Sequence, residues 1–336
     1  MYDDNSPMQL ENPQTVQTNT ELPSGVLKLE HLGIIRVTGA DAVSFLQGQL
    51  TNDVALLPMN ESRLAAFCSA KGRMQASFTI YKRNALDASQ ASPNVYMVCS
   101  RDILAPTLKR LSMFVMRAKA KLTDVTDAFN IFGLTGNTIH LIAAQAINTP
   151  SIAIFNTSTV LALPPALGQS RALCITPVGD MAPVGEAIST ELWHWGEVHA
   201  GIATITAPIV DAFVPQMLNY ESVAGVNFKK GCYPGQEVVA RSQFRGTLKR
   251  RAYVVLVDAT DSQPFVSQEI FHESDAEQPC GMVAQVAKNP NGASEVYSAI
   301  VSMQTAAADG GKLTLGSASG ATITLLPLPY PLLEDI

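Results

Sequence analysis

Long apolar runs, clustered cysteines and a basic leader are all missing from this 336-residue sequence. No stretch reaches the roughly 18–20 apolar residues that a membrane-spanning helix needs. The N-terminal residues include Asp3 and Asp4 and lack a basic region followed by an apolar one, so we expect no signal peptide. The five cysteines, at positions 68, 99, 174, 232 and 280, show no C-x-x-C spacing. This scatter excludes a sequence-local zinc or iron–sulphur cradle and a secreted disulfide framework, and it favours a reducing, cytoplasmic location.

Charged residues are also few, at 15% of the chain, and the net charge is −6. This acidic balance argues against general coating of nucleic acid. The apolar fraction of 47% is ample for a core, and the length allows one large domain or two to three smaller ones. The cations that do occur are concentrated, because residues 228–251 hold seven Lys or Arg and one acid, a local charge of +6. We therefore expect a local basic site there.

The segment 229–237, KKGCYPGQE, lies within this basic cluster. Its two glycines allow a tight turn and its proline stiffens the chain, so the segment predicts a rigid loop that displays Cys232. Residues 236–244 contain neither Gly nor Pro and predict a short helix. A thiol beside a helix N-terminus and near lysines is typical of a reactive thiolate. The alternative is a buried small residue in a plain connector.

Local patterns elsewhere predict a mixture of strands and helices. Residues 33–39 read as a strand, after which Asp41 is expected to cap a helix. Residues 63–70 and 73–83 read as two strands joined by a turn at Lys71 and Gly72. Short apolar segments separated by turn residues follow one another from 252 to 328 and predict a small antiparallel barrel or sandwich.

The KKGCYPGQE segment resembles the signature of the YgfZ family of folate-binding proteins, which is related to the T-protein, an aminomethyltransferase of the glycine cleavage system. The resemblance extends over residues 39–54, 65–78, 193–201 and 213–221. It implies an α+β fold: a T-protein-like folate-binding domain of mixed antiparallel sheets and helices, followed by a small C-terminal β-barrel. The expected divisions are a disordered tail at 1–25, the folate-binding domain at 26–245 and the barrel at 246–336.

The resemblance also implies site residues. Trp193 is similar to a folate-contacting tryptophan of the family, and its indole is suited to stacking on a pterin; the alternative is a core tryptophan. Glu221 is the candidate for bonding the amino-pyrimidine edge of the pterin, although a surface acid is an equal alternative. Arg241, or Lys230 in its place, is the candidate for binding the folate carboxylates. Where some members have a second aromatic residue, this chain has Leu32.

The function that the resemblance implies is a tetrahydrofolate-binding accessory protein that supports iron–sulphur enzymes, such as those that methylthiolate tRNA, with Cys232 as the functional thiol. One alternative is a true folate-dependent aminomethyltransferase, which needs an aspartate near the folate; Asp102 is the sole acid in the corresponding region, 94–102. The other is an RNA-binding module that uses the basic cluster. His194 and His199 are five residues apart, a spacing unsuited to a shared ion on one helix, so no metal site is expected.

Overall fold

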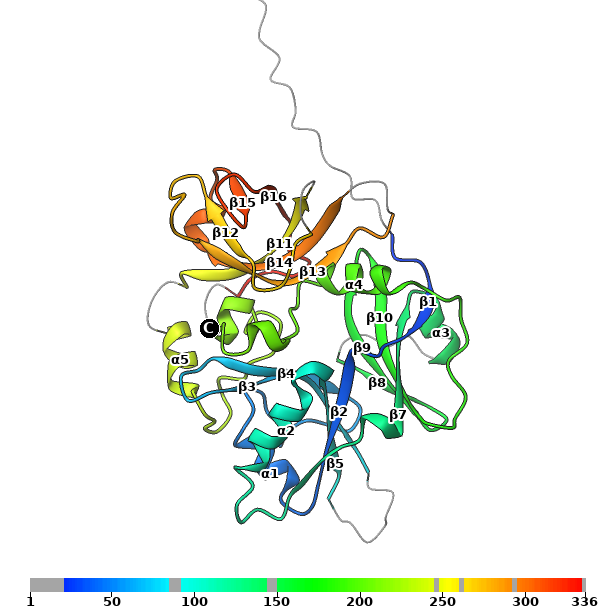
Figure 1. Ribbon diagram of the computed structural model, residues 1–336. Helices are drawn as coiled ribbons and strands as arrows, with labels where there is room; N and C mark the ends of the chain where they lie inside the picture. Colours follow the sequence, from blue (N-terminus) through cyan, green and yellow to red (C-terminus); the bar gives the residue numbers. More distant parts are fainter. Residues whose placement is uncertain are drawn as a thin grey trace, which may run out of the picture.

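The computed structural model describes residues 21–84, 92–143, 150–244, 248–259, 263–291 and 295–333. The predicted disordered tail falls largely on residues 1–20, which lie outside the described residues. The described chain forms two five-stranded sheets and a closed six-stranded barrel (Figure 1). Within the described chain, no helix has the length and apolar character to cross a membrane.

The first sheet is antiparallel and has the strand order β3-β4-β5-β2-β6. Its strands are β2 (Leu32–Thr38), β3 (Ser62–Cys68), β4 (Met74–Arg83), β5 (Asn94–Ser100) and β6 (Lys121–Asp124). Helices α1 (Ala42–Gln47) and α2 (Leu104–Ser112) accompany it, with 3₁₀ turns η1 (Arg101–Ile103) and η2 (Thr126–Ala128). The predicted hairpin at Lys71 and Gly72 is confirmed as the β3–β4 turn.

The expected capping role of Asp41 is wrong, because its side chain makes no cap hydrogen bond to α1. The Asp41 carboxylate instead accepts the N–H of Lys119, 2.7 Å away, and so joins the start of α1 to the segment before β6. The Asp41 carboxylate therefore binds the backbone N–H of Lys119, 78 residues along the chain, and not an N–H of the first turn of α1.

The second sheet is also antiparallel, in the order β1-β7-β10-β9-β8. Its strands are β1 (Gly25–Lys28), β7 (Phe129–Thr135), β8 (Ile152–Phe155), β9 (Ser158–Ala166) and β10 (Gln169–Pro177), and its helices are α3 (Thr138–Ile142) and α4 (Thr190–His199). One apolar cluster joins the two sheets, because Ile34 and Val98 of the first pack with Ile131 and Leu173 of the second.

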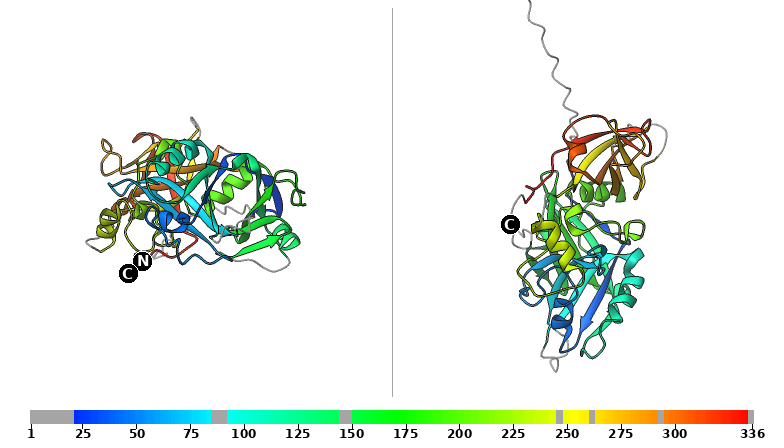
Figure 2. Two further views of the ribbon diagram at one scale, coloured as in Figure 1. Left: turned by 90° about the horizontal axis from the view of Figure 1, so that it is seen from below. Right: turned by 90° about the vertical axis from the view of Figure 1, so that its left-hand side faces the viewer.

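The C-terminal strands close into a barrel in the order β11-β14-β13-β12-β15-β16, which confirms the predicted fold class. They are β11 (Arg250–Asp258), β12 (Glu269–His272), β13 (Gly281–Lys288), β14 (Val296–Gln304), β15 (Leu313–Leu315) and β16 (Ala321–Leu326), with η5 (Thr305–Ala308) after β14. Closure pairs every strand on both sides and removes exposed sheet edges. The barrel occupies one end of the molecule in both side views (Figures 1 and 2).

The chain between α4 and the barrel carries most of the basic cluster, which ends at Arg250 and Arg251 in β11. It contains η3 (Ala207–Ile209), η4 (Pro215–Leu218) and α5 (Gln236–Phe244), so the helix predicted at 236–244 is confirmed. Helix α4 lies between the barrel and the second sheet, and its Trp195 and Val198 pack in one core with Ala284 and Ile300 of the barrel. These contacts fix α4 relative to the two sheets and the barrel.

Candidate functional site

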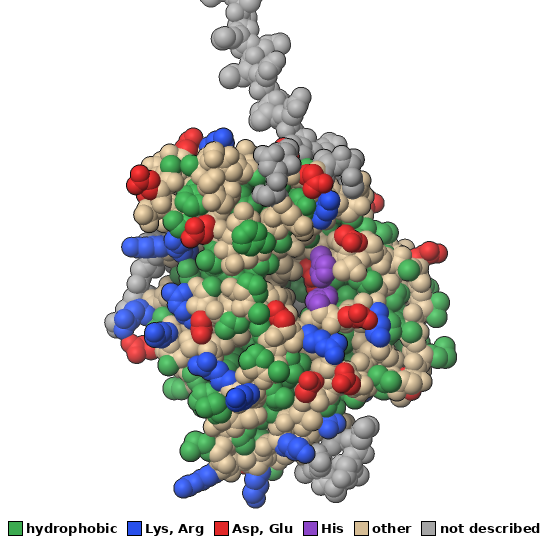
Figure 3. All heavy atoms as spheres, viewed as in Figure 1, with side chains coloured by type: hydrophobic (Ala, Val, Ile, Leu, Met, Phe, Trp, Pro, Cys, Tyr) green, Lys and Arg blue, Asp and Glu red, His purple; other side chains and the backbone are tan. Residues whose placement is uncertain are grey.

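A cavity of about 660 Å³ lies between the two sheets. Strands β2 to β5 line one side, strands β9 and β10 line the other, and residues 197–204 and 220–229 complete the wall. Most of the lining is apolar, with Leu32, Phe78, Val98 and Leu173 among the contributors. The space-filling view shows a hollow on this face of the molecule (Figure 3). A cavity of this size and character suits a small organic ligand, for which roughly 300–1,000 Å³ is usual.

Arg171 is the buried cation of this cavity. It lies on β10, is only 4% exposed, and contributes to the cavity lining. Its guanidinium carbon lies 4.5 Å from the centre of the Trp193 ring, and its Nε has no hydrogen-bond partner among the described residues. Burial lowers the pKa of Arg171 to about 10, although nearby Glu197 acts in the opposite direction. A buried guanidinium with an unused N–H donor is a ready anchor for a polar ligand.

Trp193 lies beneath Arg171 rather than on the cavity wall. It is 1% exposed, and its six-membered ring lies so close to Gly133 that a Cβ there would come within 2.4 Å of it. Helix α4 sets this position from Ser189, whose side chain accepts the N–H of Leu192 as an N-cap. The indole therefore supports the guanidinium, and Arg171 stands between Trp193 and the cavity.

Glu197, one helical turn after Trp193, also lines the cavity. Its carboxylate accepts a hydrogen bond from His194 Nδ1 at 2.8 Å and lies 3.6 Å from His31 Nε2. Burial by itself would raise the pKa of Glu197, but the hydrogen bond from His194, the nearby His31 and the charge of Arg171 hold it well below its usual range. Glu197 is therefore an ionised carboxylate at the cavity wall.

Cys232 lies on an exposed loop, whereas the other four cysteines are buried. Gly235 ends this loop with φ +79°, and a Cβ there would come within 2.4 Å of the Ser69 carbonyl oxygen and 2.6 Å of Gly72 Cα. The loop therefore lies directly on the β3–β4 turn, and only glycine permits this approach. The buried ring of Tyr233 anchors it on one side of the cysteine. The segment also reaches the cavity, because Lys229 contributes to its lining.

Lys230 is buried beside this loop, and its ammonium group binds carbonyl oxygens at the C-terminal end of α1. Its Nζ donates to the carbonyl oxygens of Gln47 and Leu50, at 2.5 and 2.6 Å, and lies 4.9 Å from the centre of the Tyr233 ring. A cation at the C-terminal end of a helix complements the helix dipole. Burial lowers the pKa of Lys230 to about 8, with Asp53 opposing the shift. All its described polar contacts are therefore structural.

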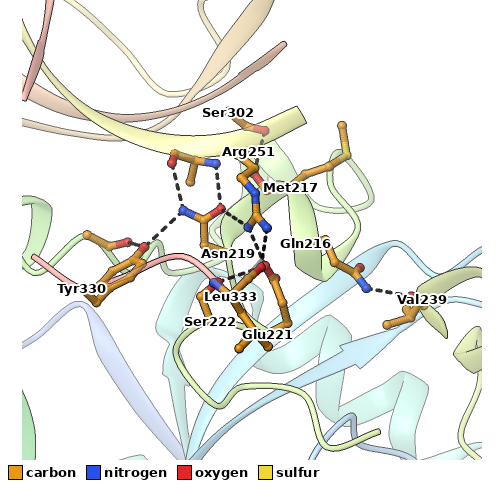
Figure 4. A network of polar contacts seen from close by, with 12 residues as sticks. Gln216, Met217, Asn219, Glu221, Ser222, Val239, Arg251, Ser302, Tyr330 and Leu333 are labelled. Atoms are coloured by element: carbon orange, nitrogen blue, oxygen red, sulfur yellow. Dashed lines mark hydrogen bonds and ion pairs between the residues drawn. The ribbon is translucent and has the colours of Figure 1, made fainter. Parts of the chain in front are cut away.

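Glu221 is directed toward the barrel (Figure 4). Its Oε1 lies 2.6 Å from Arg251 Nη1, and both side chains are nearly or wholly buried. Arg251 Nη2 also donates to the Leu333 carbonyl oxygen at 2.8 Å. Arg241, by contrast, is exposed on α5 and pairs with Glu237 at 2.5 Å. Glu221 and Arg241 thus have protein partners in the structure.

The five residues predicted from the sequence are therefore not brought together. None of them contributes to the cavity wall that the described residues form; the set comprises Trp193, Glu221, Lys230, Arg241 and Cys232. Arg171 and Glu197 were not predicted from the sequence, although a lone arginine before the apolar residues 172–175 of β10 is itself an unusual signal. His31 carries no comparable local signal.

The basic cluster is also dispersed by the fold. Lys230 and Arg251 are buried in structural contacts, and Arg250 donates to the Cys280 carbonyl oxygen at 2.8 Å. Arg241 is paired with Glu237, and Arg245 lies outside the described residues. The exposed cations in the described part of the cluster are Lys229, Arg241 and Lys249.

Asp102, the acid considered for an aminomethyltransferase, is held away from the cavity. Its Oδ1 accepts the Ser100 hydroxyl at 2.6 Å and its Oδ2 accepts the Ala207 N–H at 2.8 Å. The carboxylate therefore links η1 to η3, and no observation favours a catalytic role for it.

Comparison with known proteins finds no family model that matches the chain. The chain is 32% identical to the tRNA-modifying protein YgfZ of Photobacterium profundum over 243 residues, or 70% of each protein. It is 29% identical to the tRNA-modifying protein YgfZ of Yersinia enterocolitica over 342 residues, 96% of this chain and 97% of that protein. The crystal structure of the glycine cleavage system aminomethyltransferase T from Bartonella henselae shares the fold, with a TM-score of 0.61 at 15% identity over 93% of this chain and 87% of that one. The chain belongs to the YgfZ family of tRNA-modifying proteins.

Proposed function

We propose that this protein binds tetrahydrofolate or a related folate in the cavity between its two sheets. We further propose that Cys232 is the thiol through which it supports iron–sulphur enzymes of tRNA modification. The observation that carries the folate proposal is the cavity of about 660 Å³ with the unsatisfied Arg171 Nε on its wall. The family relation to tRNA-modifying proteins and the fold shared with an aminomethyltransferase support it.

The chemistry of a folate matches this cavity. The flat pterin needs apolar walls for its faces, and Leu32, Phe78 and Leu173 supply such walls. The pterin carbonyl and the folate carboxylates are acceptors only, and the Arg171 fork offers donors only. Trp193 then acts through Arg171, because the indole holds the guanidinium at the wall.

The contacts predicted for Glu221, Lys230 and Arg241 stay predictions. Lys230 and Arg241 would first have to leave the α1 carbonyls and Glu237, respectively, and Glu221 is held by Arg251 through Oε1 although its Oε2 has no hydrogen-bond partner among the described residues. Leaving is least costly for Arg241, because exposed ion pairs contribute roughly 0–1 kcal/mol. Arg241 is therefore the useful comparison for Arg171.

The test is a calorimetric titration of the protein with tetrahydrofolate and 5-formyltetrahydrofolate, using the wild type, Arg171→Met and Arg241→Ala. We expect one folate per wild-type chain, at least about tenfold weaker binding in Arg171→Met, and unchanged binding in Arg241→Ala, since a hydrogen bond to a charged group contributes about 1.5–3 kcal/mol. The opposite ranking of the two variants would move the contact to Arg241. No binding to the wild type at millimolar folate would refute the proposal.

The thiol is tested separately with Cys232→Ser. Because the side chain is exposed, we expect the variant to fold with an unchanged thermal midpoint while tRNA methylthiolation falls in cells that carry it in place of the wild type. Ser242→Ala, on the exposed face of α5, is the control for surface change. Normal methylthiolation in Cys232→Ser would refute the role of the thiol and leave folate binding unaffected.

A further inference from the structure

Three potential metal ligands converge beside the cavity. His31 lies in the turn between β1 and β2, and His194 and Glu197 lie three residues apart on α4. One ligand atom from each lies within 4.8 Å of the other two. The two imidazole rings are 4.9 Å apart between centroids and are inclined at 59°. Figure 3 shows histidine side chains beside the hollow on this face.

The backbone holds these three residues in place. The Arg101 N–H donates to the His31 carbonyl oxygen at 2.8 Å and fixes the turn against the first sheet. His194 and Glu197 lie within the capped helix α4, on the same face because they are three residues apart. A site on such fixed elements needs little reorganisation before it binds a ligand.

The donor set selects the kind of ion. Two imidazole nitrogens and one carboxylate oxygen suit divalent zinc, iron or cobalt, and the three ligands leave coordination positions open for water. An ion at about 2.0–2.2 Å from each ligand atom needs ligand separations of roughly 3–3.5 Å, so only small side-chain movements are required. The two histidine side chains are about one-third exposed, at 36% and 35%, which gives an ion access.

The surrounding charges allow a cation. The carboxylates of Glu197 and Glu191 both lie near His194, and Glu191 stands in the first turn of α4. Arg171 is the opposing charge, but it stacks on Trp193 and makes no ion pair with Glu197 within 4.0 Å. Its guanidinium therefore leaves the Glu197 oxygens to the histidines.

We propose that His31, His194 and Glu197 form a binding site for one divalent transition-metal ion of the zinc and iron(II) class. Because Glu197 also lines the cavity, the ion lies at the cavity edge with its open positions available to water or to a ligand. The competing explanation is a plain ion pair between a protonated His194 and Glu197, with His31 nearby. That arrangement is complete without a metal ion, and it predicts that the protein does not bind one at this site.

The test is a titration of chelator-treated full-length protein with Co²⁺, followed by its visible absorption, and with Zn²⁺ in competition. We expect one Co²⁺ ion per chain, with the visible absorption bands of a cobalt ion in an asymmetric protein site. His31→Ala should weaken binding at least as much as the roughly 10–100-fold that loss of an outer-shell partner costs. His140→Ala, an exposed histidine on α3, should bind like the wild type.

Three outcomes decide the proposal. No cobalt spectrum in the wild type, or wild-type affinity in His31→Ala, would overturn it and leave the ion pair as the explanation. Equal losses in His31→Ala and His140→Ala would also overturn it, since they would indicate scattered surface binding. Because His31 is partly exposed in a turn, we expect His31→Ala to fold, and the test needs no variant of the less exposed Glu197.

Discussion

Glu221 shows how the partner of a residue sets its role. This acid, predicted to bind a pterin, forms a buried ion pair with Arg251, and its own side chain is 0% exposed. A buried pair contributes little net stability over apolar packing, but removal of one member leaves an uncompensated charge. The folded state therefore depends on Glu221 whether or not a folate is bound.

We predict that Glu221→Ala lowers the free energy of unfolding by about 3–5 kcal/mol, measured by urea denaturation. Glu237→Ala, which removes an exposed ion pair, is the matched control and should cost less than about 1 kcal/mol. A wild-type midpoint for Glu221→Ala would mean that the Arg251 contact is absent in solution.

Burial also determines which of the five cysteines has a reactive thiol. Burial raises the pKa of Cys68 to about 12 and that of Cys99 to about 12, with nearby acids adding to each shift. These thiols stay protonated well above neutral pH, and the thiolate is the reactive form. Cys232 is the exposed thiol of the five.

We predict that iodoacetamide modifies the native protein once, at Cys232, because that thiol is exposed while the buried thiols of Cys68 and Cys99 stay protonated. The readout is peptide mass spectrometry, with the urea-unfolded chain as the fully labelled reference. An adduct on Cys68 or Cys99 in native protein would contradict the described burial.

At the scale of elements, the signature segment is coupled to a hairpin far from it in sequence. The positive φ of Gly235 and the backbone of Ser69 and Gly72 leave no room for a Cβ. The KGCYPGQE segment and the β3–β4 turn thus form one structural unit that displays the thiol. This explains in physical terms why a glycine stands at 235.

We predict that Gly235→Ala destabilises the fold by about 1–3 kcal/mol through overpacking, and that it changes the alkylation rate of Cys232 because the loop has to move. Gly231→Ala is the matched control, since nothing lies within 4 Å of a Cβ built there. Equal thermal midpoints for the two variants would refute this close packing.

At the scale of the whole molecule, the barrel docks through buried polar contacts (Figure 4). Asn219 exchanges two hydrogen bonds with the backbone of Ala252, and Ser302 donates to the Met217 carbonyl oxygen at 2.7 Å. The C-terminal segment adds to them, because Tyr330 donates to the Gly201 carbonyl oxygen at 2.6 Å. The tail thus links the barrel, the end of α4 and the Glu221 region.

We predict that removal of residues 329–336 lowers the free energy of unfolding by about 2–4 kcal/mol. The described part of the tail makes four hydrogen bonds, two between Tyr330 and Gly201 and Asn219 and two between Leu333 and Arg251 and Ser222, each worth about 0.5–1 kcal/mol. Tyr330→Phe should reproduce about half of the loss. An unchanged denaturation midpoint after truncation would show that the tail does not dock.

The sequence by itself determined the features that depend on local pattern. The helix at 236–244, the hairpin at Lys71 and Gly72 and the C-terminal barrel follow from turn residues and from short apolar segments, which restrict the backbone wherever they occur. The long signature identified the family and marked the loop that displays Cys232.

Only the tertiary structure decided what each functional side chain meets. Lys230 bonds carbonyls 180 and 183 residues away, and Arg171 lies between Trp193 and the cavity. His31 joins His194 across the sequence, whereas His199 packs against Trp195. The physical reason is that the role of a polar side chain depends on the atoms around it, and the packing of two sheets and a barrel brings those atoms together from distant segments.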